Sequence, residues 1–155
     1  TNLKKLTKII FRVLIISMFM IIYSYYFLAD HFLSLPIDKF KMWVLIIILY
    51  PFLSALPQEI IFRSFFFQRY NQILNKNNLI ILNGLIFGIL HVIYLNLIVI
   101  LIATIGGILF AKNYYCNKSL FLVTLEHSLL GIVIFSIGFG YYFNNSNIKY
   151  IYEFL

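Results

Sequence analysis

Five apolar stretches separated by short polar links dominate the sequence, and the longest of them could cross a lipid bilayer. They cover residues 9–28, 42–74, 79–95, 97–111 and 119–143. A span needs about 20 consecutive apolar residues to match the hydrocarbon core of a membrane. The chain is 63% hydrophobic and only 11% charged, far from the composition of a soluble domain. We therefore expect residues 1–155 to form a single integral membrane domain, an all-α, polytopic transmembrane bundle of about five spans.

The second stretch is too long for one straight span of about 20 residues. It contains Pro51 and Pro57, and a proline inside a helix removes a backbone donor and crowds the preceding turn. We expect this stretch to kink or break at a proline, and its amphipathic end, residues 63–74, to lie at the membrane surface. The first stretch is not followed by a small-x-small cleavage site, so we expect it to be retained as a helix.

The basic residues predict an orientation in the membrane, because cytoplasmic links carry an excess of lysine and arginine. With the N-terminus in the cytoplasm, the cytoplasmic side holds Lys4, Lys5, Lys8, Arg12, Arg69, Lys76, Lys112 and Lys118, and the outer side holds Lys39, Lys41 and Lys149. This distribution favours a cytoplasmic N-terminus. The net charge of +7 suits anionic lipid at the membrane surface. It does not indicate nucleic-acid binding, because no basic stripe with exposed aromatic residues is present.

Ionisable side chains occur at three places inside the apolar stretches. Glu59 and Arg63 lie in the second stretch, His91 in the third, and Glu126 and His127 in the fifth. Such residues are costly in lipid and usually face a partner or a water-filled cavity. Together they predict one buried site, of an intramembrane enzyme or a binding protein.

Each of these residues also has a purely structural interpretation. Glu59 and Arg63 are four residues apart and share a helix face, so they could form a buried ion pair that locks two helices. His91 could be a hydrogen-bonding core residue. Gly84 and Gly88 precede it and form a small-residue face that lets another helix approach closely.

The third link and the last stretch add further candidates. Asn96 marks a tight return between the third and fourth stretches, and we count it as a supporting residue. The adjacent Glu126 and His127 project about 100° apart on a helix, so one of them is expected to face a neighbouring helix unless the cavity is wide. Gly131, one turn beyond His127, leaves space there.

A metal site is neither required nor excluded by these residues. Two histidines and one or two glutamates would satisfy the ligand preferences of zinc, but no His-Glu-x-x-His pattern is present. Cys116 is the only cysteine and cannot build a thiolate site. No Ser-His-Asp arrangement is supported either, since the serines lack the context of a nucleophile. A mechanism based on glutamate and histidine would need no cofactor.

The order and spacing of the motifs resemble those of the CPBP family. Its members are intramembrane endopeptidases related to the CAAX prenyl protease, and they include bacteriocin-processing and bacteriocin-immunity proteins. The resemblance covers about residues 42–143 and is most specific in Gln-Glu-Ile-Ile-Phe-Arg at residues 58–63. Phe-x-x-x-His at residues 87–91 and a helix with a second histidine follow. It implies hydrolysis of peptide bonds in membrane-associated substrates, within a bacterial inner membrane.

The sequence departs from the family pattern at two positions. Gln58 stands where a water-activating glutamate is usual, and glutamine cannot act as a general base. Gly131 stands where the family usually has an asparagine that helps to hold the oxyanion. The chain is thus a variant with Gln-Glu in the first motif. The alternative is a non-catalytic member, such as a bacteriocin-immunity or membrane-binding protein; a small transporter would be expected to show an internal repeat.

The family resemblance implies that a glutamate activates the water, with His91 polarising it and His127 helping to stabilise the oxyanion. Glu59 and Glu126 are both candidates. Arg63 would favour the charged form of Glu59 and weaken it as a proton acceptor, whereas Glu126 has no fixed cation other than His127. The residues therefore favour Glu126 as the base and a Glu59–Arg63 brace, while the resemblance favours the first motif.

Overall fold

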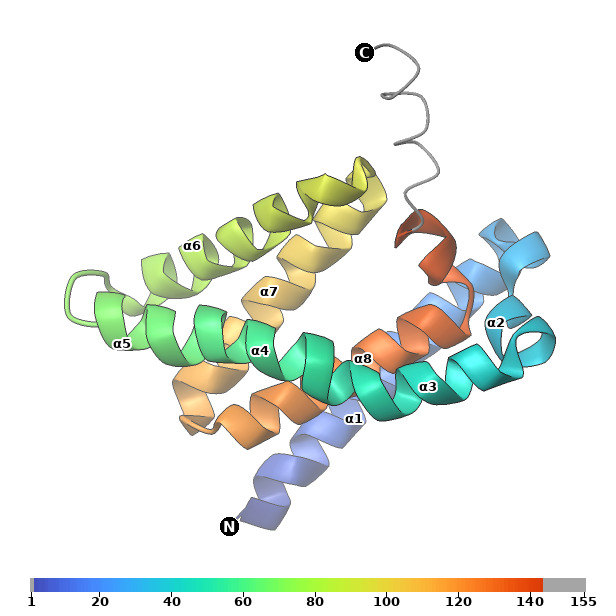
Figure 1. Cartoon of the computed structure of the whole chain (residues 1–155). Coiled ribbons are helices and arrows are strands. Elements are labelled where there is room, and N and C mark those ends of the chain that lie inside the picture. Colours follow the sequence, from blue (N-terminus) through green and yellow to red (C-terminus); the bar gives the residue numbers. More distant parts are fainter. Residues whose placement is uncertain (1, 144–155) are drawn as a thin grey trace.

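The computed structural model describes residues 2–143, and within them all regular structure is helical. The helices are α1 (Asn2–Phe27), α2 (Ser34–Asp38), α3 (Phe40–Tyr50), α4 (Leu56–Glu59), α5 (Phe66–Tyr70), α6 (Lys76–Ile89), α7 (Leu97–Asn117) and α8 (Leu120–Ser136) (Figure 1). Short 3-10 turns follow α1, α6 and α8, at Ala29–His31, Leu90–Tyr94 and Phe139–Phe143. The predicted all-α class is confirmed. Lys149, which entered the prediction of orientation, lies outside the described residues.

Four helical segments are long and apolar enough to cross a membrane, and they are Leu3–Phe27, Phe40–Tyr70, Lys76–Tyr94 and Leu97–Asn117. α8 is equally apolar but has 17 residues, which gives a length of about 26 Å. The chain is an integral membrane protein. The five predicted spans correspond to these four long segments and one shorter helix.

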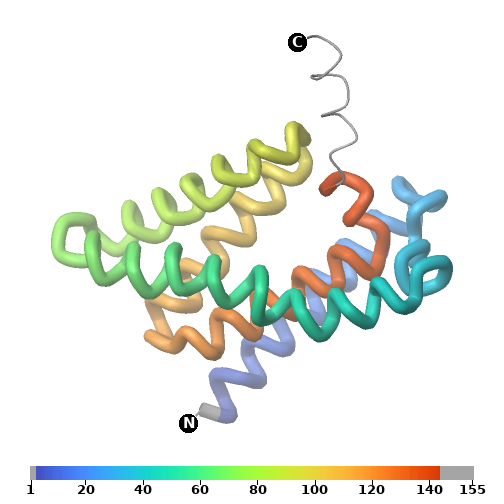
Figure 2. The backbone as a smooth tube through the Cα atoms, in the orientation of Figure 1, coloured from blue at the N-terminus to red at the C-terminus, as the bar shows by residue number. Residues whose placement is uncertain are grey.

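Residues 40–70 form one continuous helix, which Figure 2 shows as a single run of the tube. The helix is continuous through both prolines, so the expectation that it breaks at one of them is wrong. Two π-helical turns, Pro51–Ala55 and Ile60–Phe65, flank the short α4. A π turn is wider than an α turn and moves each hydrogen bond by one residue, so the helix can continue past a ring that has no donor. Asn83 of α6 also donates to the carbonyl of Phe62 (2.6 Å) inside the second π turn.

α6 and α7 pack closely against each other along their length (Figure 1). A Cβ atom on Gly88 would lie 3.0 Å from the Cα of Thr104, and one on Gly107 would lie 3.0 Å from the Cα of Gly84. Only residues without a side chain permit this approach. The predicted packing face at Gly84 and Gly88 is therefore confirmed, and its partner is α7.

The bundle is apolar outside and carries charge inside. Large apolar side chains such as Phe11, Leu53 and Phe121 are exposed on its surface, whereas Glu59, Arg63, Asn83 and Glu126 have no exposed area. This distribution suits a protein whose surroundings are lipid, because each buried charge must find its partners within the bundle. Arg63, expected near the membrane surface, is one of these buried groups.

Candidate active site

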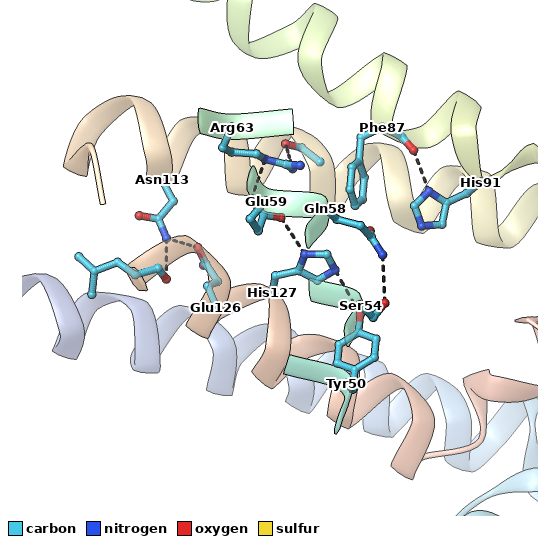
Figure 3. A network of polar contacts seen from close by, with 12 residues as sticks. Tyr50, Ser54, Gln58, Glu59, Arg63, Phe87, His91, Asn113, Glu126 and His127 are labelled. Carbon is cyan, nitrogen blue, oxygen red and sulfur yellow. Dashed lines mark hydrogen bonds and ion pairs between the residues drawn. The ribbon is translucent and has the colours of Figure 1, made fainter. Parts of the chain in front are cut away.

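Glu59 is the centre of a buried polar network (Figure 3). Its Oε1 lies 2.7 Å from Nδ1 of His127, and its Oε2 lies 3.0 Å from Nε of Arg63. Glu59 is the last residue of α4 and Arg63 lies in the second π turn, which follows it directly. The predicted Glu59–Arg63 pair is present, and it is joined to α8 through the imidazole.

Arg63 is held by α7 as well as by Glu59. Its Nη2 donates to the backbone carbonyl of Gly107 (3.1 Å), and its guanidinium carbon lies 4.5 Å from the centroid of the Phe87 ring. A guanidinium stacked on an aromatic face gains a favourable cation–π contact. Arg63 therefore fixes the position of the Glu59 carboxylate and connects the long helix to the α6–α7 pair.

The partners of His127 determine which of its nitrogens carries the proton. An ionised carboxylate only accepts hydrogen bonds, so Nδ1 donates to Glu59. In the neutral ring Nε2 then carries a lone pair, and it lies 3.2 Å from the hydroxyl oxygen of Tyr50. The imidazole also stacks on Phe110, with ring centroids 4.6 Å apart. His127 is thus a rigidly held imidazole with a carboxylate on one nitrogen.

His91 lies in the 3-10 turn Leu90–Tyr94 that follows α6. Its Nδ1 is 2.7 Å from the carbonyl oxygen of Phe87; because a carbonyl can only accept, Nδ1 carries the hydrogen. Nε2 of the neutral ring is left as an acceptor. The Phe87 ring contacts both imidazoles, with centroid distances of 4.8 Å to His91 and 5.7 Å to His127.

A cavity of about 530 Å³ brings the two histidines together. α1, α7 and α8 form most of its wall. Among residues 2–143, the polar side chains that line it are Tyr23, Tyr50, His91 and His127, and the other lining residues are aliphatic, aromatic or glycine. An apolar cavity with a few convergent polar groups is a common form of ligand site.

Glu126 belongs to a different polar cluster. Its Oε1 pairs with the guanidinium of Arg12 (2.5 Å), and its Oε2 accepts from the amide of Asn113 (2.6 Å). It does not line the cavity. The expectation that Glu126 has no cation other than His127 is wrong, because α1 brings Arg12 against α8. The adjacent His127 points the other way, as the 100° rotation between consecutive helical residues requires.

Two supporting candidates also have defined positions. Gln58 donates from Nε2 to the hydroxyl of Ser54 (3.0 Å), while its Oε1 is buried and has no hydrogen-bond partner within residues 2–143. Asn96 accepts from the backbone N–H of Ile98 (2.9 Å) and caps the start of α7, outside the cavity lining. Gln58 is adjacent to Glu59 in the sequence, and Asn96 stabilises the predicted turn between the third and fourth apolar stretches.

Tyr50 is a site residue that sequence reasoning missed. It is one of twelve tyrosines, and nothing in its immediate neighbours sets it apart. The available signal was Gly131, whose missing side chain leaves room one turn beyond His127. The Tyr50 ring occupies that room.

The described residues do not fit a zinc site. No three His, Cys, Asp or Glu side chains among them are close enough to share a metal ion. Both nitrogens of His127 and both oxygens of Glu59 already have partners. A tetrahedral zinc needs three or four free ligands, and the described side chains, as they are arranged, do not supply them.

Residues 40–133 match the family model described as type II CAAX prenyl endopeptidase Rce1-like. This range is more than half of the chain and includes Gln58–Arg63, His91 and His127. No curated protein and no solved structure matches the chain. The family resemblance inferred from the motifs is therefore confirmed: the chain belongs to the type II CAAX prenyl endopeptidase Rce1-like family.

Proposed function

We propose that the protein is an intramembrane endopeptidase that hydrolyses peptide bonds of membrane-associated substrates with an activated water. The observation that carries this proposal is the position of His127: its imidazole lines an apolar cavity and donates from Nδ1 to the buried carboxylate of Glu59. A second imidazole, His91, lines the same cavity, and its neutral ring has Nε2 as an acceptor because Nδ1 donates to Phe87. The name of the matched family supports a peptide-bond hydrolase.

In this proposal His127 is the final acceptor of the proton that the water gives up. Glu59 holds the Nδ1–H and stabilises the imidazolium that forms, which is the role of the acidic residue in a Ser-His-Asp triad. Arg63 keeps Glu59 in place. The two oxygens of Glu59 are both engaged, so a direct role as base suits Glu59 less well than the role of orienting His127.

His91 positions the water. Its Nε2 accepts one hydrogen of the water while the other proton moves towards His127. The water oxygen adds to the carbonyl carbon of the peptide, and the tetrahedral intermediate collapses when the imidazolium of His127 passes that proton on to the leaving nitrogen. The products are a carboxylic acid, which ionises, and an amine. Glu126 takes no part and braces α1 against α7 and α8.

The orientation with a cytoplasmic N-terminus, in a bacterial inner membrane, is part of the same proposal. The N-terminus, the α5–α6 turn and the α7–α8 turn lie towards one side of the bundle in Figure 1, and the α6–α7 turn lies towards the other. This arrangement gathers the basic residues counted for the cytoplasm on one side. A reporter that is active only outside the cytoplasm should be silent when fused after Lys112 and active when fused after Phe143. The opposite pattern would reverse the orientation.

The test of the activity is cleavage by the purified full chain in liposomes. The probes are membrane-anchored peptides with a CAAX end, with and without a prenyl group, and products are identified by mass spectrometry. We expect cleavage by the parent, also with a chelator present, and a loss of at least about 10²-fold for His127→Gln. His31→Gln is the matched control, because His31 stacks on Tyr141 away from the cavity.

Two results would overturn the proposal in different ways. A folded parent protein that binds the peptides and cleaves none of them would favour the non-catalytic alternative, for which Gln58 is the supporting feature. Activity that disappears with the chelator and returns with zinc would overturn the metal-free mechanism alone.

A further inference from the structure

Tyr50 and His127 both line the cavity, and the hydroxyl of Tyr50 occupies the position next to Nε2 of His127. Tyr50 is the last residue of α3, and its ring lies over Gly131, where a Cβ atom would overlap it. Its ring also meets those of Phe135 and His127 edge to face, with centroid distances of 5.6 Å and 6.0 Å. These contacts fix the ring, and the hydroxyl lies 3.2 Å from Nε2 of His127.

This contact controls access to the imidazole. Nδ1 of His127 already donates to Glu59, so Nε2 is the one nitrogen of the ring that can gain a proton, and Tyr50 donates to it. A water in the cavity must displace the Tyr50 hydroxyl or pass its proton through it. The packing of the ring over Gly131 leaves the hydroxyl little freedom to move aside.

The geometry points to Tyr50 as a catalytic residue that relays the proton between the reacting groups and His127. The inference rests on the proposed endopeptidase activity. It makes the reacting unit a Glu59–His127–Tyr50 series that runs from a buried carboxylate to a half-buried phenol. The phenol contacts the substrate, and the imidazole holds the proton.

The proton balance of the relay closes in two steps. As the water oxygen bonds to the peptide carbonyl carbon, the water gives a proton to the Tyr50 oxygen, and the phenolic proton passes to Nε2 of His127. The intermediate is an oxyanion, balanced by the imidazolium beside Glu59. When the C–N bond breaks, the leaving nitrogen takes the proton from Tyr50, and His127 returns its proton to the phenol oxygen. Every group of the protein ends in its starting state.

The test compares Tyr50→Phe with the parent on a peptide that the parent cleaves. Phenylalanine keeps the packing over Gly131 and removes only the hydroxyl, so we expect kcat to fall by about 10²-fold or more, with KM and thermal stability unchanged. Tyr114→Phe is the matched control, because that tyrosine packs on Phe67 outside the cavity, and it should cleave like the parent.

A second variant separates a relay from a merely structural hydroxyl. Replacing Tyr50 with 3,5-difluorotyrosine keeps the shape of the residue and makes the phenol more acidic. The alkaline limb of the kcat–pH profile should then move to lower pH. Normal cleavage by Tyr50→Phe, or an unmoved profile in the fluorinated protein, would overturn the relay and leave the endopeptidase proposal standing. A parent protein that cleaves no peptide would overturn both.

Discussion

Two carboxylates are buried among the described residues of this bundle, and they differ in the residue that faces their second oxygen. Glu59 and Glu126 are both fully buried, and each pairs with an arginine, Arg63 or Arg12. The remaining oxygen of Glu59 faces an imidazole of α8, whereas that of Glu126 faces the amide of Asn113. An imidazole exchanges a proton near neutral pH, and an amide does not.

The comparison shows that a buried ion pair in a membrane helix does not by itself mark a reactive site. A buried pair can be replaceable by apolar residues without loss of stability, so its presence says little about its purpose. The residues beside the ion pair determine whether it belongs to a reactive site. The Glu59 pair adjoins a cavity through His127, whereas the Glu126 pair joins three helices and neither of its members lines the cavity.

Glu59→Gln should have the largest effect and tests the first half of this contrast. The glutamine amide can donate to Nδ1 of His127 and favours the wrong tautomer, for which a loss of about 10⁴-fold in kcat is the precedent in a triad. Leaving Arg63 buried without its partner should also cost about 3–5 kcal/mol of stability. Cleavage is to be measured at a temperature where the variant is folded, and the tautomer by ¹⁵N NMR of the imidazole. Normal cleavage by folded Glu59→Gln would remove Glu59 from the mechanism.

Gly88→Leu should have the next largest effect and should act on only one of the two clusters. The new side chain would collide with Thr104 of α7, and overpacking of this kind costs about 1–3 kcal/mol. Separating α6 from α7 moves His91, three residues further along the chain, and should lower kcat. The Arg12–Glu126 cluster lies on α1, α7 and α8 and should be unaffected.

The matched control for that variant is Leu85→Ala, because Leu85 is on α6 with its side chain exposed. It should change neither stability nor cleavage appreciably. If Gly88→Leu folds and cleaves like the parent, the α6–α7 contact does not position His91.

The same two clusters explain what could be predicted from the sequence. The all-α bundle follows from the lengths of the apolar stretches, and the Glu59–Arg63 pair from a spacing of four residues on one helix. Both are local properties of the chain. A close helix contact at Gly84 and Gly88 was likewise predictable, because these glycines are one turn apart, but the spacing does not identify α7 as the partner.

Contacts between distant residues were not predictable in this way. Arg12 contacts Glu126 at a sequence separation of 114 residues, and Tyr50 contacts His127 at a separation of 77. No local sequence pattern predicts either contact. The unbroken long helix was missed for another reason. Helix propensity predicts that Pro51 and Pro57 disturb an α-helix. It does not predict that the helix will continue through them by forming π turns.

Glu126→Gln should have a smaller effect than either variant above, and it tests the second half of the contrast. Cleavage should stay within about twofold of the parent, since the side chain does not line the cavity. Stability should fall by about 1–3 kcal/mol, less than the loss expected for a fully buried pair, because the Arg12 side chain is 34% exposed and water can solvate its charge. A folded Glu126→Gln protein without activity would restore Glu126 as the base.

Replacing both members of the Arg12–Glu126 pair should have the smallest effect of all. In Arg12→Met combined with Glu126→Leu no charge is left without a partner, and the apolar side chains can pack among Ile9, Val13 and Leu122. Stability should then lie within about 1 kcal/mol of the parent, as for other buried pairs exchanged for apolar residues. Thermal unfolding in detergent and the cleavage rate measure the two outcomes. The same exchange at the other cluster, Glu59→Leu with Arg63→Met, should also leave a folded protein but abolish cleavage, because His127 loses the carboxylate that orients it. If the Arg12–Glu126 exchange instead abolishes cleavage in a folded protein, the two buried carboxylates act together, and the contrast between a reactive cluster and a bracing one is wrong.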